Sequence, residues 1–348
     1  MRNSLLYILV LLGLPSMNVQ AQDPHFSQYY FTPLQINPAL TGIFEGRMRG
    51  SVSYRDQWSS LLSNNTFRTI KASADVRMAF KKNDFISVGF TLLGDEVGEG
   101  NYRQTNGHLL VSYHKKLIDS KYSDNTQFLI AGLKAGGGNN SLAYTNLWFG
   151  RQYDINAELV VPWAPNGEPF SDTATENFAD LGLGLMWYAT TTDHSYYAGV
   201  SMDHINEPNI SLIGSNSKLY RKTSILVGAS IPLDEGSFLL PSAVYLVQGP
   251  YRQYNFGSQV RFSRYEWGEV ALRVGLFFRY SKRLDGNHFD ALIISTALEM
   301  GKITLGLGYD VTVSSLQSFN SRRGAFEVNV IYQSQAFERR KKLTCPKF

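Results

Sequence analysis

The stretch TIKASADVRM, residues 69–78, alternates strictly between polar and apolar side chains. Successive side chains of a β-strand point to opposite faces, so this segment would form a strand with one apolar and one charged face. A strand buried in a parallel sheet would instead be apolar on both faces. The alternation therefore predicts a strand that lies between oil on one side and water on the other.

The same alternation recurs along the chain, separated by turn-forming residues such as Lys81-Lys82-Asn83-Asp84 and Asp285-Gly286-Asn287. Many of these segments approach the roughly 9–11 residues that a tilted membrane strand needs, and a closed barrel pairs every backbone amide within lipid. We therefore predict an all-β protein, a transmembrane antiparallel barrel of about 14 strands, with a soluble β-sandwich as the rival fold. The candidate strands lie near residues 46–55, 69–78, 85–93, 108–114, 128–135, 178–188, 195–202, 223–231, 238–247, 252–262, 268–280, 291–300, 303–311 and 325–332.

The composition and the N-terminus agree with export to an outer membrane. Charged residues make up only 18% of the chain and aromatic residues 13%, which suits aromatic belts at two membrane interfaces. Residues 1–21 resemble a signal peptide, with Arg2, an apolar run from Leu5 to Leu14, and Val19-Gln20-Ala21 as the cleavage site. The alternative for this segment is an uncleaved buried helix. The expected mature chain starts at Gln22.

Charge and cysteine content exclude several classes of protein. Removal of Arg2 leaves 33 − 1 = 32 basic residues against 29 acidic ones, a net charge of +3 that is too small to indicate nucleic-acid binding. The single cysteine, Cys345, cannot form a disulfide within the chain. We expect no nucleic acid, metal or cofactor.

No catalytic constellation stands out from the sequence. The six histidines include no metal-spaced pair such as HExxH; His194 and His204 each follow an aspartate, which is a weak signal for a metal or proton-relay role. The glycine pairs at 182/184 and 306/308 lie within strands, so they do not form phosphate loops, and strand curvature explains them more simply. The sequence predicts that the protein is not an enzyme.

The segment DPHFSQYYFTPLQINPALTG, residues 23–42, has neither a strand nor a helix period. Together with YRDQWSSL (54–61), FRTIKASAD (67–75), LGLGYDVTVSSL (305–316) and CPKF (345–348), it resembles the PorP/SprF family of type IX secretion system membrane proteins. One departure is Gly324-Ala325, where a His-Glu-like pair would be expected. The motif residues carried by the resemblance are Asp23, Pro24, Phe26, Ser27, Gln28, Tyr29, Asn37, Pro38, Ala39, Gly42, Arg55, Gln57 and Trp58.

The resemblance implies a fatty-acid-transporter-like outer-membrane barrel whose N-terminal segment folds inside the lumen. It also implies a role in protein secretion and gliding motility, with no catalytic residue. The implied partners are outer-membrane lipid, a large secreted surface protein (an adhesin), a periplasmic peptidoglycan-binding lipoprotein and the components of a trans-envelope secretion motor.

These observations divide the chain into a signal peptide (1–21), an irregular plug or lid (22–45), a barrel (46–333) and a basic tail (334–348). We expect the amides of Gln28, Gln35 and Asn37 to bond lumen-facing groups, since irregular backbone is tolerated at membrane depth when it is buried in protein. The expected lumen-facing partners are Lys71, Asp75, Arg77 and Arg273.

The tail is either a solvated terminus or a docking site for periplasmic partners or anionic lipid. Its candidate residues are Arg339, Arg340, Lys341, Lys342, Cys345, Pro346 and Phe348. For the whole protein, the leading hypothesis is a non-enzymatic component that exports or anchors a surface protein. The alternatives are a barrel transporter of hydrophobic small molecules, which would share the fold, and an outer-membrane lipid hydrolase, for which the sequence offers no convergent Ser, His and Asp or Asn.

Overall fold

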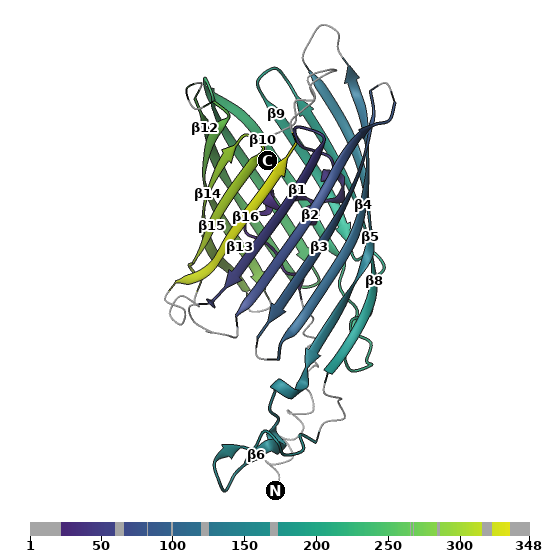
Figure 1. Ribbon diagram of the computed structural model, residues 1–348, viewed down its shortest axis with the longest axis vertical. Coiled ribbons are helices and arrows are strands. Elements are labelled where there is room, and N and C mark those ends of the chain that lie inside the picture. The colour runs from purple at the N-terminus through teal and green to yellow at the C-terminus, as the bar shows by residue number, and fades with distance from the viewer. Residues whose placement is uncertain are drawn as a thin grey trace, which may run out of the picture.

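The computed structural model describes residues 22–334 except 60–65, 82, 99, 120–124, 168–172, 265, 267, 284–285 and 315–321. Fourteen antiparallel strands close into one barrel, in which β1 pairs with both β2 and β16 (Figure 1). Each predicted strand is present, so the predicted barrel is confirmed. The barrel strands are β1 (Met48–Gln57), β2 (Phe67–Ala79), β3 (Phe85–Val97), β4 (Tyr102–Asp119), β5 (Thr126–Ala143), β8 (Thr173–Thr190), β9 (Ser195–Asp203), β10 (Lys222–Asp234), β11 (Ser237–Gln248), β12 (Tyr251–Ser263), β13 (Val270–Arg283), β14 (Gly286–Met300), β15 (Ile303–Thr312) and β16 (Arg323–Gln333).

The barrel is apolar outside, and its charged and polar side chains are buried on the inside. On β2, Ile70 is 53% exposed whereas its neighbours Thr69 and Lys71 are only 5% and 4% exposed. Exposed Leu, Val, Ile and Phe side chains form an outward band on the other strands as well. A soluble sandwich would bury this apolar face, so the exposed band excludes it and fits contact with lipid. No helix in the described part of the chain is both long and apolar enough to cross a membrane.

The two ends of the barrel differ. At the end where β1 begins and β16 finishes, which we call the hairpin end, the connections are short and include 191–194, 235–236 and 301–302. At the opposite end, the loop end, the connections include 144–172 and 204–221. Strands β4, β5 and β8 each have 18 residues, and β5 and β8 project beyond their neighbours at the loop end, toward the bottom of Figure 1. A separate hairpin of β6 (Tyr153–Asp154) and β7 (Leu159–Val160) lies further out.

The hydrophobic core lies inside the barrel and is built around the N-terminal segment. This segment forms three short helices, η1 (Tyr29–Phe31), α2 (Pro33–Ile36) and η2 (Pro38–Leu40). Pro33 and Pro38 occupy helix starts, where a missing N–H is tolerated. The apolar side chains of the segment cluster with inward-facing residues of the strands, including Leu110, Ile130, Met186, Phe277 and Ile293.

Candidate functional site

The candidate site is the barrel interior, which the N-terminal plug (residues 22–45) crosses from the loop end to the hairpin end. Asp23 contacts groups at the loop end, whereas Gly42 and Phe44 contact groups near the start of β1. Between these ends Gln28 and Asn37 are no more than 1% exposed. The predicted irregular plug inside the lumen is therefore present.

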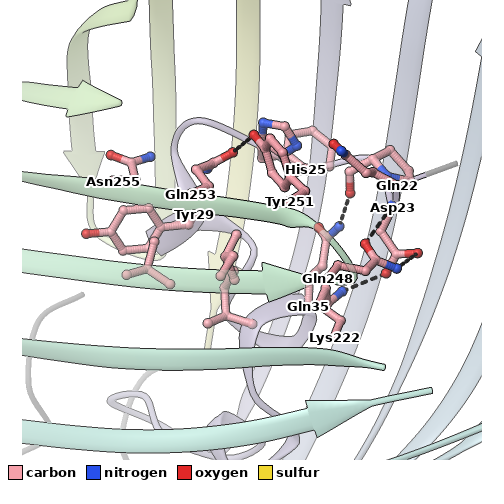
Figure 2. A pocket seen from close by; sticks show the side chains of 15 residues that line it. Gln22, Asp23, His25, Tyr29, Gln35, Lys222, Gln248, Tyr251, Gln253 and Asn255 are labelled. Carbon is pink, nitrogen blue, oxygen red and sulfur yellow. Dashed lines mark hydrogen bonds and ion pairs between the residues drawn. The ribbon is translucent and has the colours of Figure 1, made fainter. Parts of the chain in front are cut away.

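Ion pairs hold Asp23, the first residue of the segment 23–42, at the loop end. The carboxylate of Asp23 accepts from Lys222 Nζ at 2.8 Å and from His204 Nε2 at 2.7 Å. Its main-chain N–H donates to Gln248 Oε1 at 3.0 Å. Figure 2 shows Asp23, Lys222 and Gln248 around a cavity of about 30 Å³, which is large enough for an ordered water molecule. Burial alone would raise the pKa of Asp23, but Lys222 and His204 hold it well below its usual range.

This contact is part of a wider charged network on neighbouring strands. His204 Nδ1 lies 2.8 Å from Asp180, and His108 Nε2 lies 2.8 Å from the other oxygen of the same carboxylate. Lys134 bridges Asp180 and Asp203, at 3.5 and 2.7 Å. Burial alone would lower the pKa of His204, but Asp23 and Asp180 raise it to about 9, so this imidazole is a cation at neutral pH.

A second charged cluster, on β1, β13, β15 and β16, binds Ser27. Ser27 N donates to Glu327 Oε1 at 2.6 Å, and its hydroxyl donates to Asp310 Oδ2 at 2.6 Å. Arg55 pairs with both Glu327 and Asp310, and Arg279 lies 2.8 Å from Asp310. All four ionic side chains are at least 90% buried. Buried charges are costly unless they are paired and hydrogen-bonded, so each partner here supports the others.

At the hairpin end, the barrel wall binds the main chain of the plug. Gly42 N donates to Asp75 Oδ2 at 2.7 Å, and Arg49 pairs with the same carboxylate at 2.8 Å. Arg77 donates to the carbonyl oxygens of Gly42 and Phe44, at 3.1 and 3.0 Å. The plug is therefore fixed at both ends and near its middle.

Glycines on the inner wall make room for the plug. A Cβ atom added at Gly184 would lie 1.9 Å from Asn37 Oδ1, and one at Gly132 would lie 2.3 Å from Ala39 N. Additions at Gly306 and Gly308 would collide with Phe31 and Gln28. Close approach of another part of the structure, here mostly plug side chains, is a recognised reason for glycine in a strand. The sequence analysis explained the glycine pairs 182/184 and 306/308 by strand curvature. The structure shows another reason at Gly184, Gly306 and Gly308, where the plug packs against the strand.

Two polar cavities lie on either side of this packing. One, of about 360 Å³, lies toward the loop end and is lined by His25, Arg55 and Arg279 among others. The second, of about 380 Å³, lies toward the hairpin end and includes Arg49 in its wall. On β13 the two cavities are separated by Phe277, which is fully buried and packs against Tyr29 and Tyr30. The described residues contain no group of three or more His, Cys, Asp or Glu side chains suited to a metal ion.

The model of the family described as "Type IX secretion system membrane protein PorP/SprF" matches residues 18–332. The chain belongs to the PorP/SprF family. The resemblance found in the sequence is thereby confirmed, and membership makes the chain an outer-membrane component of type IX secretion.

Solved structures with a similar barrel have very different sequences. The Ralstonia pickettii toluene transporter TbuX has a TM-score of 0.45 at 13% identity, covering 87% of this PorP/SprF chain and 93% of its own. OmpF of Salmonella typhi, in complex with daunomycin, has a TM-score of 0.39 at 9% identity, covering 82% and 98%. Both scores are below 0.5, so these likenesses say nothing about function. No curated protein sequence matches the chain.

The predicted plug contacts of this PorP/SprF protein are correct in part. Lys71 Nζ donates to Gln35 Oε1 at 3.4 Å, as expected. The other amides bond differently: Asn37 Nδ2 donates to the main-chain oxygens of Leu185 and Val200, at 3.2 and 3.1 Å. The prediction that they would bond Asp75, Arg77 and Arg273 was wrong, because the first two of these bind plug backbone and Arg273 pairs with Glu299.

The predicted motif residues fall into three places. Ten lie in the plug, from Asp23 to Gly42. Arg55 belongs to the charged cluster around Ser27 and donates to Gln57 Oε1 at 3.2 Å. Trp58, at the loop end of β1, has a φ of 63° and stacks edge-on against Phe67 at 5.3 Å. The predicted signal peptide and the tail residues from Arg339 to Phe348 lie outside the described residues.

Sequence reasoning missed the charged network around Asp23. His204 was noted only as a histidine that follows an aspartate, and Lys134, Asp180 and Lys222 were not singled out. The alternation of each strand places these side chains on the inner face of the barrel, which could have been predicted. Which of them contact one another depends on the register between the strands. That register cannot be read from one strand at a time.

Proposed function

We propose that this PorP/SprF protein is a non-enzymatic accessory of type IX secretion that helps to export or anchor a secreted surface protein through contacts at its loop end. The observation that carries the proposal is a group of exposed apolar side chains in residues 144–167, beyond the barrel wall. Trp148, Ile155 and Trp163 are 60%, 78% and 85% exposed. Aromatic side chains displayed in this way are enriched at protein interfaces.

The lengths of the connections support an extracellular position for the loop end. Outer-membrane barrels have short periplasmic turns and longer extracellular loops. The hairpin end would then face the periplasm, and the tail that follows Gln333 would emerge there. In this position the basic tail could meet a peptidoglycan-binding lipoprotein and the trans-envelope motor. We also propose that residues 1–21 direct export of the chain and are cleaved after Ala21.

The filled lumen argues against a conduit for hydrophobic small molecules. The plug divides the interior, and the charged side chains that hold it would be costly neighbours for a lipid. The larger cavities on each side are lined by arginines, including Arg55 and Arg49, rather than by an apolar path. A role through protein contacts fits this interior better than transport does.

Deletion of the gene, followed by quantitative proteomics of the cell surface, tests the proposal. We expect the loss of one or a few large secreted proteins, restored by a plasmid-borne wild-type copy. A mutant that keeps its whole surface proteome but loses fatty-acid uptake would instead support the transporter.

A further inference from the structure

Among the described residues, strand β8 has one edge that no other strand pairs along its first part, outside the membrane-facing band. Its pairing with β9 ends at Leu183, whereas its pairing with β5 continues to Thr173 (Figure 1). Side chains on the outer face change along β8 from Leu185, Leu183 and Leu181 to Asn177 and Thr175. The polar part of the strand therefore projects into water at the loop end.

The direction of the main-chain groups at this edge follows from the residues next to it. Asn206 Nδ2 donates to Ala179 O at 2.7 Å, and Leu181 N donates to Asn206 Oδ1 at 3.1 Å. The main chain of Ile205 also donates to Leu181 O, at 3.1 Å. Odd-numbered residues of β8 therefore direct their N–H and C=O groups away from β5. By the alternation of an antiparallel strand, those of Thr175 and Asn177 point the same way.

This edge already binds a substitute for a neighbouring strand. The carboxamide of Asn206 offers one donor and one acceptor to Ala179 and Leu181, as a peptide group would. Within the described residues, no strand continues the pairing past it. Native proteins usually block exposed edges with proline, lysine or a bulge. Thr175–Asn177 contains no proline, lysine or register shift with β5; its one charged residue, Glu176, has main-chain groups that face β5.

The geometry points to β-strand addition: an extended segment of the secreted client pairs with β8 along Thr175–Asn177, continuing the sheet from the position of Asn206. Main-chain groups recognise any extended polypeptide, and side-chain contacts then supply selectivity. The exposed aromatic residues of 144–167 lie further out on the same projection and provide such contacts. This inference rests on the proposed function and specifies how the client is held.

The test uses the full chain in its native membrane. Thr175→Pro removes an N–H that faces the open edge, so it blocks strand addition while the bonds to β5 remain. Thr175→Ala is the matched control, because it changes the side chain and keeps the main chain. A photoreactive amino acid at position 177 then records what lies beside the edge, and mass spectrometry identifies the linked peptide.

We expect adducts with one short segment of a secreted protein, about tenfold fewer with Thr175→Pro than with Thr175→Ala. Adducts with a second copy of this chain, or equal yields from the two variants, overturn the inference. A normal surface proteome in Thr175→Pro, beside the loss of a client in the gene deletion, would leave the proposed function standing and remove strand addition alone. An unchanged proteome in the deletion strain would remove the proposed function itself.

Discussion

Gly184 allows the plug to lie against the barrel wall, so Gly184→Ala should loosen the plug while the barrel stays closed. The new Cβ would lie 1.9 Å from Asn37 Oδ1, so Asn37 must move. Its two bonds to the main-chain oxygens of Leu185 and Val200 would be lost. At about 1 kcal/mol for each bond, with at least about 1 kcal/mol for overpacking, the docked plug loses roughly 3 kcal/mol. The undocked population should then rise about a hundredfold.

Single-channel recording in planar bilayers measures this population directly. The wild-type protein should be nearly silent, Gly184→Ala should open in bursts, and a variant lacking residues 23–42 should conduct continuously. Gly94→Ala is the matched control, since a Cβ there would meet only a methyl carbon of Ile70 at an ordinary 3.5 Å. If both Gly184→Ala and the deletion conduct no more than the wild type, the plug does not close the barrel.

Three further variants or conditions test the energetics of the barrel and plug. Glu327→Ala should lower the free energy of unfolding in detergent by about 3–5 kcal/mol, because it leaves the buried guanidiniums of Arg55 and Arg279 to share one carboxylate, that of Asp310; a loss below about 1 kcal/mol in guanidinium titration would contradict this. Leu133→Arg, on the outward band, should cost about 2–4 kcal/mol in lipid bilayers, whereas Ser141→Arg on the same strand should cost almost nothing; equal costs would remove the lipid-facing assignment. The raised pKa of His204 means that its contribution to plug docking is complete below about pH 6.5 and is lost as the pH rises through about 9; the protection factor of the Asp23 amide, which compares its exchange rate with the intrinsic rate at the same pH, should therefore fall over that range, and an unchanged protection factor would refute the ion pair.

The barrel could be predicted from the sequence because its physical cause is local. Each strand separates lipid from a polar lumen, so its side chains alternate between apolar and polar. This alternation can be read within a single segment such as TIKASADVRM, without knowing which strands lie beside it. The long connection 144–172 was less predictable. Its prolines and glycines indicated only a loop, and the 18-residue lengths of β5 and β8 became evident only from their pairing.

The interior was predicted less well because it depends on contacts between distant residues. That the plug enters the lumen followed from the family resemblance, and one contact, from Lys71 to Gln35, was predicted correctly. The pair of Asp23 with His204 joins residues separated by 181 positions, and it requires both the barrel register and the path of the plug. Gly184 could not be interpreted from the sequence for the same reason. A glycine in a strand indicates that space is needed there, but it does not identify the residue that fills the space.

The central claim is that the protein works through contacts at the loop end of a closed barrel. The register pairs Ala143 with Thr173, so residues 144–172 can be replaced by an Asn-Gly turn that joins the two strands directly. Heat-dependent migration on gels would verify that this variant still folds as a barrel. With the variant as the only copy in the cell, we predict that surface proteomics shows the same lost proteins as the gene deletion. A complete surface proteome in that strain would contradict the account.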